Sequence, residues 1–274
     1  MKALKTIVLC FFITTITFAN VAQSEKEALL ALYNATQGEN WTNTWDLDKP
    51  IDSWYGVTLK NNKVVSLDLE FNNLQGNLPQ EIGDLTHIQE IRLGFNKLTG
   101  TLPQSITKLN DLSVLELYMN RLEGELPQDI GNLTNLTILK LFSNSFTGEI
   151  PTSITHLENL KELLLGSNFL TGEIPASIEN LKNLEKLSLI DNKLEGYIPV
   201  EISALKNLKE LVLSSNNLIG SLPYQITDLE SLNVIMVSDN NLDTEYVTVT
   251  DKSNQPTIMG LPIEEGVATD FDDD

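Results

Sequence analysis

The sequence has very few of the side chains that most enzymes use for catalysis or metal binding. Its 274 residues include one cysteine, Cys10, and two histidines, His87 and His156. Each histidine lies beside an inward apolar residue of a repeated pattern, which places it on the outer surface. No phosphate-binding loop, nucleophile elbow or metal-ligand spacing is present. The sequence therefore predicts a protein that is not an enzyme and that has no cofactor and no metal site.

Basic residues are also scarce. The chain has 18 Lys and Arg against 38 Asp and Glu, so its formal net charge is -20. The phosphate backbone of a nucleic acid would meet a repelling field, and the same holds for an anionic membrane surface. We therefore expect no nucleic acid among the partners. The excess of acid by itself indicates solubility rather than an acidic binding site.

Long apolar runs are missing except near the start of the chain. Lys2 and Lys5 precede an apolar run over residues 7–19, and small and polar residues follow. A membrane-spanning helix needs about 20 apolar residues, so the shorter run predicts a secretory signal peptide over residues 1–22. An uncleaved anchor is the alternative. After cleavage, which would remove Cys10, we expect a protein without disulfides and without stable membrane insertion, either secreted or located at the cell surface or in the periplasm.

One repeated pattern dominates the rest of the sequence. It reads L-x-x-L-x-L-x-x-N-x-L-x-G-x-L/I-P-x-x-I-x-x-L, and the pattern is a leucine-rich repeat. A single repeat cannot bury its apolar face, so neighbouring repeats must stack. The predicted fold is an α/β repeat solenoid with a curved parallel sheet on its concave face and short 3-10 or irregular segments on its convex face. The asparagine recurs every 24 residues, at Asn72, Asn96, Asn120, Asn144, Asn168, Asn192, Asn216 and Asn240.

The repeat positions predict their own structural roles. We expect each asparagine to turn inward and hydrogen-bond the backbone, forming a ladder along the stack. The glycine allows a turn that a side chain would obstruct, and the proline ends strand pairing towards the convex side. The repeats occupy residues 64–243, as seven full copies and a partial eighth. Residues 244–274 are predicted to form a C-terminal cap, which starts with a strand, and an acidic tail.

Residues 23–63 are predicted to form an N-terminal cap. Ser24 and Glu27 have the spacing of a capping box that opens an amphipathic helix. Three tryptophans follow, and tryptophans in a secreted protein can stack on sugars. Here they are expected to cover the first repeat instead. They are Trp41, Trp45 and Trp54.

The segment around Trp54, Gly56 and Val57, followed by repeats with L-x-G-x-I/L-P, resembles the plant-type leucine-rich repeat family. That family includes receptor-like kinase ectodomains and polygalacturonase-inhibiting proteins. The resemblance covers about residues 27–242 and implies a protein that binds a protein or polysaccharide through its concave face. Asp52 and Leu59 stand where the family cap has two cysteines, so the capping disulfide is absent. This departure predicts a secreted microbial member of the family.

The outward strand positions, which lie four, two and one residues before each asparagine, are the candidate binding site. Charges alternate over the first four strands, and aromatic residues gather beside them. Exposed aromatic groups on a rigid sheet mark interaction surfaces. The alternative is that the aromatic side chains only pack against one another, while the charges fix register and solubility. The predicted ligand-binding residues are Phe71, Arg92, Phe95, Glu116, Tyr118, Met119, Lys140 and Phe142.

Two further functions remain open beside that of a non-enzymatic binding protein for a protein or polysaccharide partner. One is an inhibitor of a secreted glycan-degrading enzyme, as in the polygalacturonase-inhibiting relatives. The other is a passive matrix or adhesion module that binds copies of itself.

Overall fold

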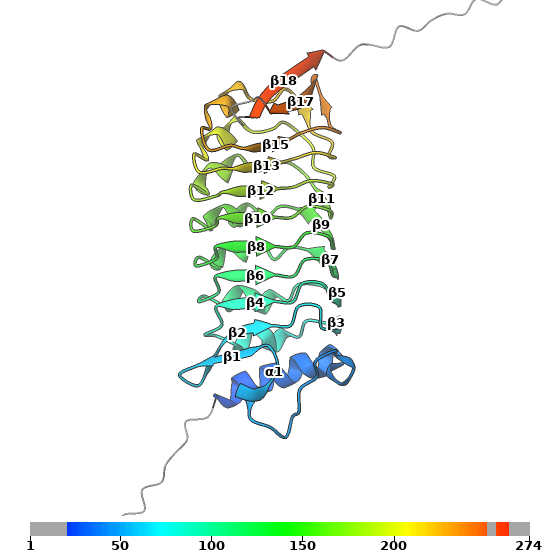
Figure 1. Cartoon of the computed structure of the whole chain (residues 1–274), viewed down its shortest axis with the longest axis vertical. Coiled ribbons are helices and arrows are strands. Elements are labelled where there is room, and N and C mark those ends of the chain that lie inside the picture. The colour runs from blue at the N-terminus through cyan, green and yellow to red at the C-terminus, as the bar shows by residue number, and fades with distance from the viewer. Residues whose placement is uncertain (1–20, 251–255, 263–274) are drawn as a thin grey trace, which may run out of the picture.

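The structure, a computed structural model, describes residues 21–250 and 256–262. Figure 1 shows an elongated stack of coils, with helix α1 (Gln23–Ala35) at one end and the hairpin of β17 (Thr244–Thr250) and β18 (Pro256–Pro262) at the other. The strand that the sequence predicts at the start of the C-terminal segment is thus present. Almost all of the predicted leader, residues 251–255 and the acidic end of the tail lie outside the described residues.

Nine strands form the larger sheet, one strand for each repeat after the initial hairpin. β1 pairs antiparallel with β2, and all later neighbours pair parallel. Equivalent positions of adjacent repeats lie opposite each other, as Leu115 does with Ile91 and Leu139. The strands are β1 (Val57–Lys60), β2 (Lys63–Asp68), β4 (Glu90–Arg92), β6 (Val114–Glu116), β8 (Ile138–Lys140), β10 (Glu162–Leu164), β12 (Lys186–Ser188), β13 (Glu210–Val212) and β15 (Val234–Met236).

A second sheet runs along one flank, and the sequence analysis did not anticipate it. It forms where the chain leaves the asparagine and passes through the repeat glycine, which has a positive φ, for example 78° at Gly124. An ideal Cβ on Gly148 would lie 2.8 Å from Cγ of Glu125 in the preceding repeat. The glycine therefore permits the turn and also leaves room for that side chain. The strands are β3 (Gln75–Asn77), β5 (Lys97–Gly100), β7 (Arg121–Glu125), β9 (Ser145–Glu149) and β11 (Phe169–Thr171), followed by the separate pair β14 (Ile219–Gly220) and β16 (Asn241–Leu242).

Short 3-10 helices form the side opposite the larger sheet, as predicted. In most repeats the proline is the residue that precedes the helix, because its fixed φ suits the start and its missing N–H is not needed there. Between them the sheets and these helices enclose a leucine and isoleucine core that is continuous from the cap to Leu242. The helices are η3 (Gln80–Asp84), η4 (Gln104–Lys108), η5 (Ile130–Asn132), η6 (Thr152–His156), η7 (Ala176–Asn180), η8 (Val200–Ala204) and η9 (Tyr224–Asp228), while η1 (Gly38–Asn40) and η2 (Ile51–Ser53) lie in the N-terminal cap.

The predicted asparagine ladder is confirmed. Asn144 is buried, and its Nδ2 donates to the carbonyl oxygens of Leu117 and Leu141, each at 3.0 Å. Its Oδ1 accepts a hydrogen bond of 3.0 Å from the backbone N–H of Leu122 in the preceding repeat. Each asparagine thus joins two repeats. A second ladder on the opposite side was missed: its asparagines donate to a carbonyl of the preceding repeat, and they are Asn135, Asn159, Asn183 and Asn207.

The N-terminal cap has the predicted helix, but the predicted capping box is wrong. Helix α1 begins one residue before Ser24, and no side chain caps it. Glu27 instead accepts a 2.8 Å hydrogen bond from the side chain of Gln23. Because Ser24 lies inside the first turn, its hydroxyl is not at the N-cap position that a capping box requires.

The three tryptophans are buried between helix α1 and the first repeat, as expected. Trp45 stacks on Trp54 with 4.7 Å between ring centroids and meets Trp41 edge-on at 4.9 Å. Each indole N–H donates to a backbone carbonyl, so no polar atom of these rings is left unpaired. The tryptophans therefore cover the open end of the core and are not available to a sugar.

The two histidines have different surroundings. His156 is exposed at the end of η6, as predicted. His87 is only partly exposed, because helix α1 packs against η3 and brings the Nδ1 of His87 to 3.5 Å from the buried carboxylate of Glu25. The expectation of a free surface histidine is therefore wrong for His87, which lies at the junction between the cap and the repeats.

Candidate functional site

Four aromatic side chains form a continuous row across the first four repeats on the larger sheet. Phe71 stacks on Phe95 with 4.1 Å between ring centroids, and Phe95 meets the ring of Tyr118 edge-on at 5.4 Å. Tyr118 in turn stacks on Phe142 at 4.7 Å. We call Phe71, Phe95, Tyr118 and Phe142 the aromatic strip. The rings pack against one another, as one of the two interpretations requires, yet Phe71 stays 61% and Phe95 40% exposed.

The backbone under this surface has an unusual conformation for bulky residues. Phe71, Phe95 and Met119 precede the repeat asparagine and have φ values of 53°, 52° and 51°. Side chains of this size rarely adopt the left-handed region, where they cost about 1–2 kcal/mol per residue. Every later repeat has a positive φ at this position as well, but uses serine or aspartate there, at Ser143, Ser167, Asp191, Ser215 and Asp239.

Tyr118 fits into the strip because Gly94 leaves space for it. An ideal Cβ on Gly94 would lie 2.8 Å from Cε1 of the Tyr118 ring and 3.0 Å from Oε1 of Glu70. The tyrosine ring and the Glu70 carboxylate therefore meet above this glycine. The sequence analysis gave Gly94 no role, although it occupies the outward position where the next two repeats have Tyr118 and Phe142.

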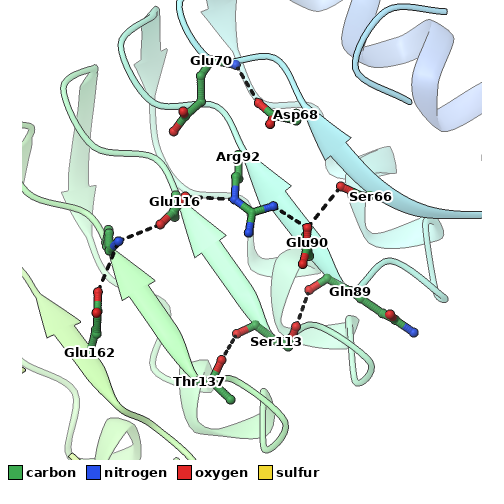
Figure 2. Close-up of polar contacts among 11 residues, drawn as sticks. Ser66, Asp68, Glu70, Gln89, Glu90, Arg92, Ser113, Glu116, Thr137 and Glu162 are labelled. Atoms are coloured by element: carbon green, nitrogen blue, oxygen red, sulfur yellow. Dashed lines mark hydrogen bonds and ion pairs between the residues drawn. The ribbon is translucent and has the colours of Figure 1, made fainter. Parts of the chain in front are cut away.

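A row of alternating charges lies beside the aromatic strip (Figure 2). Arg92 pairs with Glu90 on its own strand and with Glu116 on the next strand at 3.2 Å. Lys140 pairs with Glu116 at 2.9 Å and with Glu162 at 3.2 Å. We call these five residues the charged row. The expected pairing across strands is confirmed for Arg92, Glu116 and Lys140.

Two members of the charged row were missed. Glu90 and Glu162 lie six residues before the asparagine, while the sequence analysis considered the positions four, two and one residues before it. Alternate residues of a strand face the same side, so the position six before was a further outward position that could have been found. Conversely, Asp68 was expected to continue the alternation but forms no ion pair within the described residues.

Ion pairing holds the charges of the row in place. The hydrogen bond from Arg92 to Glu90 raises the pKa of the Arg92 guanidinium, against the opposing effect of burial. Burial acts to lower the pKa of Lys140, but its pairs with Glu116 and Glu162 outweigh this and leave the pKa raised. Both cations therefore remain charged over the whole physiological range.

Burial, and then the neighbouring Glu70 carboxylate, raise the pKa of Tyr118 to about 12 from the ordinary value of 10.0. We expect the Tyr118→Phe variant to lose an ionisation step with a midpoint near 12 from the titration of tyrosine absorbance. Since the pKa is higher in the folded state, this group stabilises the fold fully below pH 10, and the contribution is lost as the pH rises through about 12. Circular dichroism recorded in parallel checks that the protein is folded. If the ionisation step that Tyr118→Phe removes had its midpoint near pH 10, the prediction would be contradicted.

The aromatic strip ends at the fourth repeat and the charged row at the fifth. Beyond them Lys186 and Glu210, each six residues before a repeat asparagine, form a separate ion pair at 3.3 Å. The position that holds Arg92 and Glu116 holds Leu164, Ser188 and Val212 in later repeats. No aromatic residue follows Phe142 at the outward positions. All eight predicted site residues therefore lie together on one half of the larger sheet, with Met119 exposed beside Tyr118.

Within residues 21–250 and 256–262, no group of three or more His, Cys, Asp or Glu side chains is arranged to hold a metal ion. None of the helices in these ranges is long and apolar enough to cross a bilayer.

Comparisons with known proteins agree with this architecture. Residues 117–218 match a family model described as a leucine-rich repeat region, and residues 63–85 and 87–109 match a model described as a Leucine Rich Repeat. The matched chain in the crystal structure of PEPR1-AtPEP1 has 32% sequence identity to this chain and a TM-score of 0.75. The match covers 81% of this chain and 32% of that one.

Two further solved structures are similar. The plant peptide hormone receptor RGFR1 in complex with RGF2 is 38% identical, with a TM-score of 0.61, over 62% of this chain and 27% of the receptor. A plant ice-binding protein is 29% identical, with a TM-score of 0.66, over 82% of this chain and 88% of that protein. This chain thus spans about a third or less of the matched chains in the PEPR1-AtPEP1 and RGFR1 structures. The repeats, the two sheets and these matches together show that the chain is a plant-type leucine-rich repeat protein.

Proposed function

We propose that this chain is a non-catalytic binding protein that engages a protein partner through the aromatic strip and the charged row. The observation that carries the proposal is the choice of Phe71, Phe95 and Met119 at positions with positive φ. Later repeats fill the same position with small or polar residues, so the fold itself does not need bulky ones there. The left-handed backbone belongs to every repeat, but the extra cost of a bulky side chain on it does not, and such locally unfavourable choices cluster at functional sites.

The similar receptors support a protein or peptide as the partner. RGFR1 is a peptide hormone receptor solved in complex with RGF2, and its repeats resemble those of this chain. The ice-binding protein, which this chain matches over most of its length, has the same fold and a different ligand. Since one fold serves several functions, the side chains of the strip, and not the fold, support a protein partner. A secreted or cell-surface location and a microbial source belong to the same proposal.

Replacing two rings of the strip tests the proposal. The Tyr118→Ala/Phe142→Ala double variant removes the stacked pair at the C-terminal end of the strip, and large aromatic side chains carry much of the binding energy in such interfaces. We expect the full chain to bind members of a displayed random peptide library and the variant to lose at least about tenfold in affinity for them. The melting temperature should change little, because both rings are only partly buried.

Phe169→Ala is the matched control, because Phe169 is 47% exposed but lies on the second sheet. Its loss should leave peptide binding unchanged. The same three proteins applied to a glycan array would reveal a polysaccharide partner. Binding to glycans and to no peptide would overturn the protein-partner proposal, as would undiminished peptide binding by the double variant.

A further inference from the structure

Two carboxylates at the N-terminal end of the strip have no cation. Asp68 ends β2, and Glu70 lies two residues later in the turn that follows; both occupy outward positions of the first repeat, four and two residues before Asn72. Within the described residues neither forms an ion pair. The only hydrogen bond between them joins the backbone N–H of Glu70 to Oδ1 of Asp68 at 3.4 Å (Figure 2).

The Glu70 carboxylate interacts with Tyr118, whose pKa it raises through a side-chain hydrogen bond, but one of its oxygens is left without a partner. This atom, Oε1, is buried close to the ring of Tyr118 above Gly94. A buried carboxylate oxygen without a partner is unfavourable. Glu70 as a whole is only partly buried, so a cation supplied by a bound partner would approach the carboxylate from its exposed side and offset part of this cost.

The neighbouring charges cannot supply that cation. Arg92 and Lys140 are already shared among Glu90, Glu116 and Glu162. With Asp68 and Glu70 included, this surface has five carboxylates and two cations, so it carries a net charge of about -3. The excess is concentrated in the first repeat, beyond the end of the charged row.

The aromatic rings beside these carboxylates are suited to the same ligand. Phe71 follows Glu70 directly, is 61% exposed and stacks on Phe95. A cation over an aromatic face gains about 0.5–2 kcal/mol in addition to its ion pairs. A metal ion fits less well, since two carboxylates offer fewer oxygen ligands than calcium requires.

We infer that Asp68, Glu70 and Phe71 form a binding site for a lysine or arginine side chain of the protein partner. The basic group would lie against the two carboxylates and the Phe71 ring, while apolar residues next to it in the partner's sequence would contact the rest of the strip. This inference rests on the proposed function and specifies the chemistry of the partner.

Selection from the displayed peptide library tests it with the full-length chain and the Asp68→Asn/Glu70→Gln variant. Peptides selected on the unchanged protein should be enriched in lysine or arginine next to apolar residues, and peptides selected on the variant should lose only the basic enrichment. The strongest peptide, when synthesised, should bind the variant at least about tenfold more weakly. Replacing its basic residue by glutamine should weaken binding by a similar factor, and the two losses should not add, because they remove the same interaction.

The Glu125→Gln/Glu149→Gln variant is the control, because it also removes two negative charges, but on the second sheet and away from the site. It should leave the affinity for the peptide within about twofold of the unchanged protein at physiological salt. The melting temperature of Asp68→Asn/Glu70→Gln should stay the same or rise, since two like charges are removed.

The outcomes separate the two proposals. Selected peptides without basic enrichment that still depend on Tyr118 and Phe142 would overturn the basic-residue site and leave the proposed function standing. Failure to select any peptide would overturn both. Spermine tests for a free amine as the ligand: if it bound as tightly as the peptide, the site would not be one for a partner's side chain.

Discussion

Replacing Asn144 by alanine is expected to lower the free energy of unfolding by about 2–4 kcal/mol. The Asn144 side chain makes hydrogen bonds to four backbone groups in two repeats. The carbonyl oxygens of Leu117 and Leu141 would each keep a second donor, from Asn120 and Asn168. The backbone N–H of Leu122 would lose its acceptor, Oδ1 of Asn144, so the variant buries an unpaired donor in the middle of the array.

Thermal and urea unfolding measure this effect, and the melting temperature should fall by roughly 5–15 °C for a chain of this size. Asn135→Ala is the control, because Asn135 belongs to the exposed ladder on the opposite side and donates one 2.8 Å hydrogen bond. Its loss should cost less than about 1 kcal/mol. Equal effects of the two substitutions would show that the inner ladder is not the stronger link between repeats.

Gly56→Ala is expected to be equally damaging, by a steric route. Gly56 has a φ of 76°, and an ideal Cβ would lie 2.0 Å from the carbonyl oxygen of Asp68 and 2.9 Å from Cδ2 of Leu69. The Asp68 N–H also bonds the carbonyl oxygen of Gly56 at 2.8 Å, so the two backbones cannot separate without losing that bond. Strain of about 1–2 kcal/mol from the left-handed backbone adds to about 1–3 kcal/mol from overpacking.

Gly124→Ala separates the two contributions. Its φ of 78° imposes the same backbone strain, but an added Cβ would approach only the Thr101 side chain, at 2.9 Å from Cγ2. An exposed threonine can rotate away, so the cost should be about 1–2 kcal/mol. Hydrogen exchange should further show the loss of protection in Gly56→Ala concentrated at the β1–β2 hairpin. Equal destabilisation of the two variants would mean that the contact with Asp68 is easily relieved.

The repeat positions were predictable because each has one physical task in every repeat. Inward leucines, the asparagine and the glycine have the same neighbours each time, so their spacing alone identifies them. The second sheet was not predictable from the apolar pattern, because its short strands begin beside the asparagine and carry few buried side chains. The start of α1 was missed because Gln23 competes for the Glu27 carboxylate that a capping box would use.

The site was predictable only as a set of outward positions. Strand alternation identifies Arg92, Glu116 and Tyr118 as neighbours on one face, but it does not tell which carboxylate pairs with which cation. The pairing of Glu90 with Arg92, and the meeting of Tyr118 with Glu70 above Gly94, depend on side-chain directions between strands. Such contacts require coordinates.

The alternation of charge from strand to strand also limits how this gene can change in length. Copying the single repeat that contains Glu116 would place two glutamates directly opposite each other, since equivalent residues of adjacent repeats pair in register. Like charges in that arrangement are destabilising. Copying a neighbouring pair of repeats would preserve the alternation of sign, so that no two glutamates lie opposite each other. Tandem duplications and deletions in this half of the coding sequence should therefore be tolerated more readily in twos than singly.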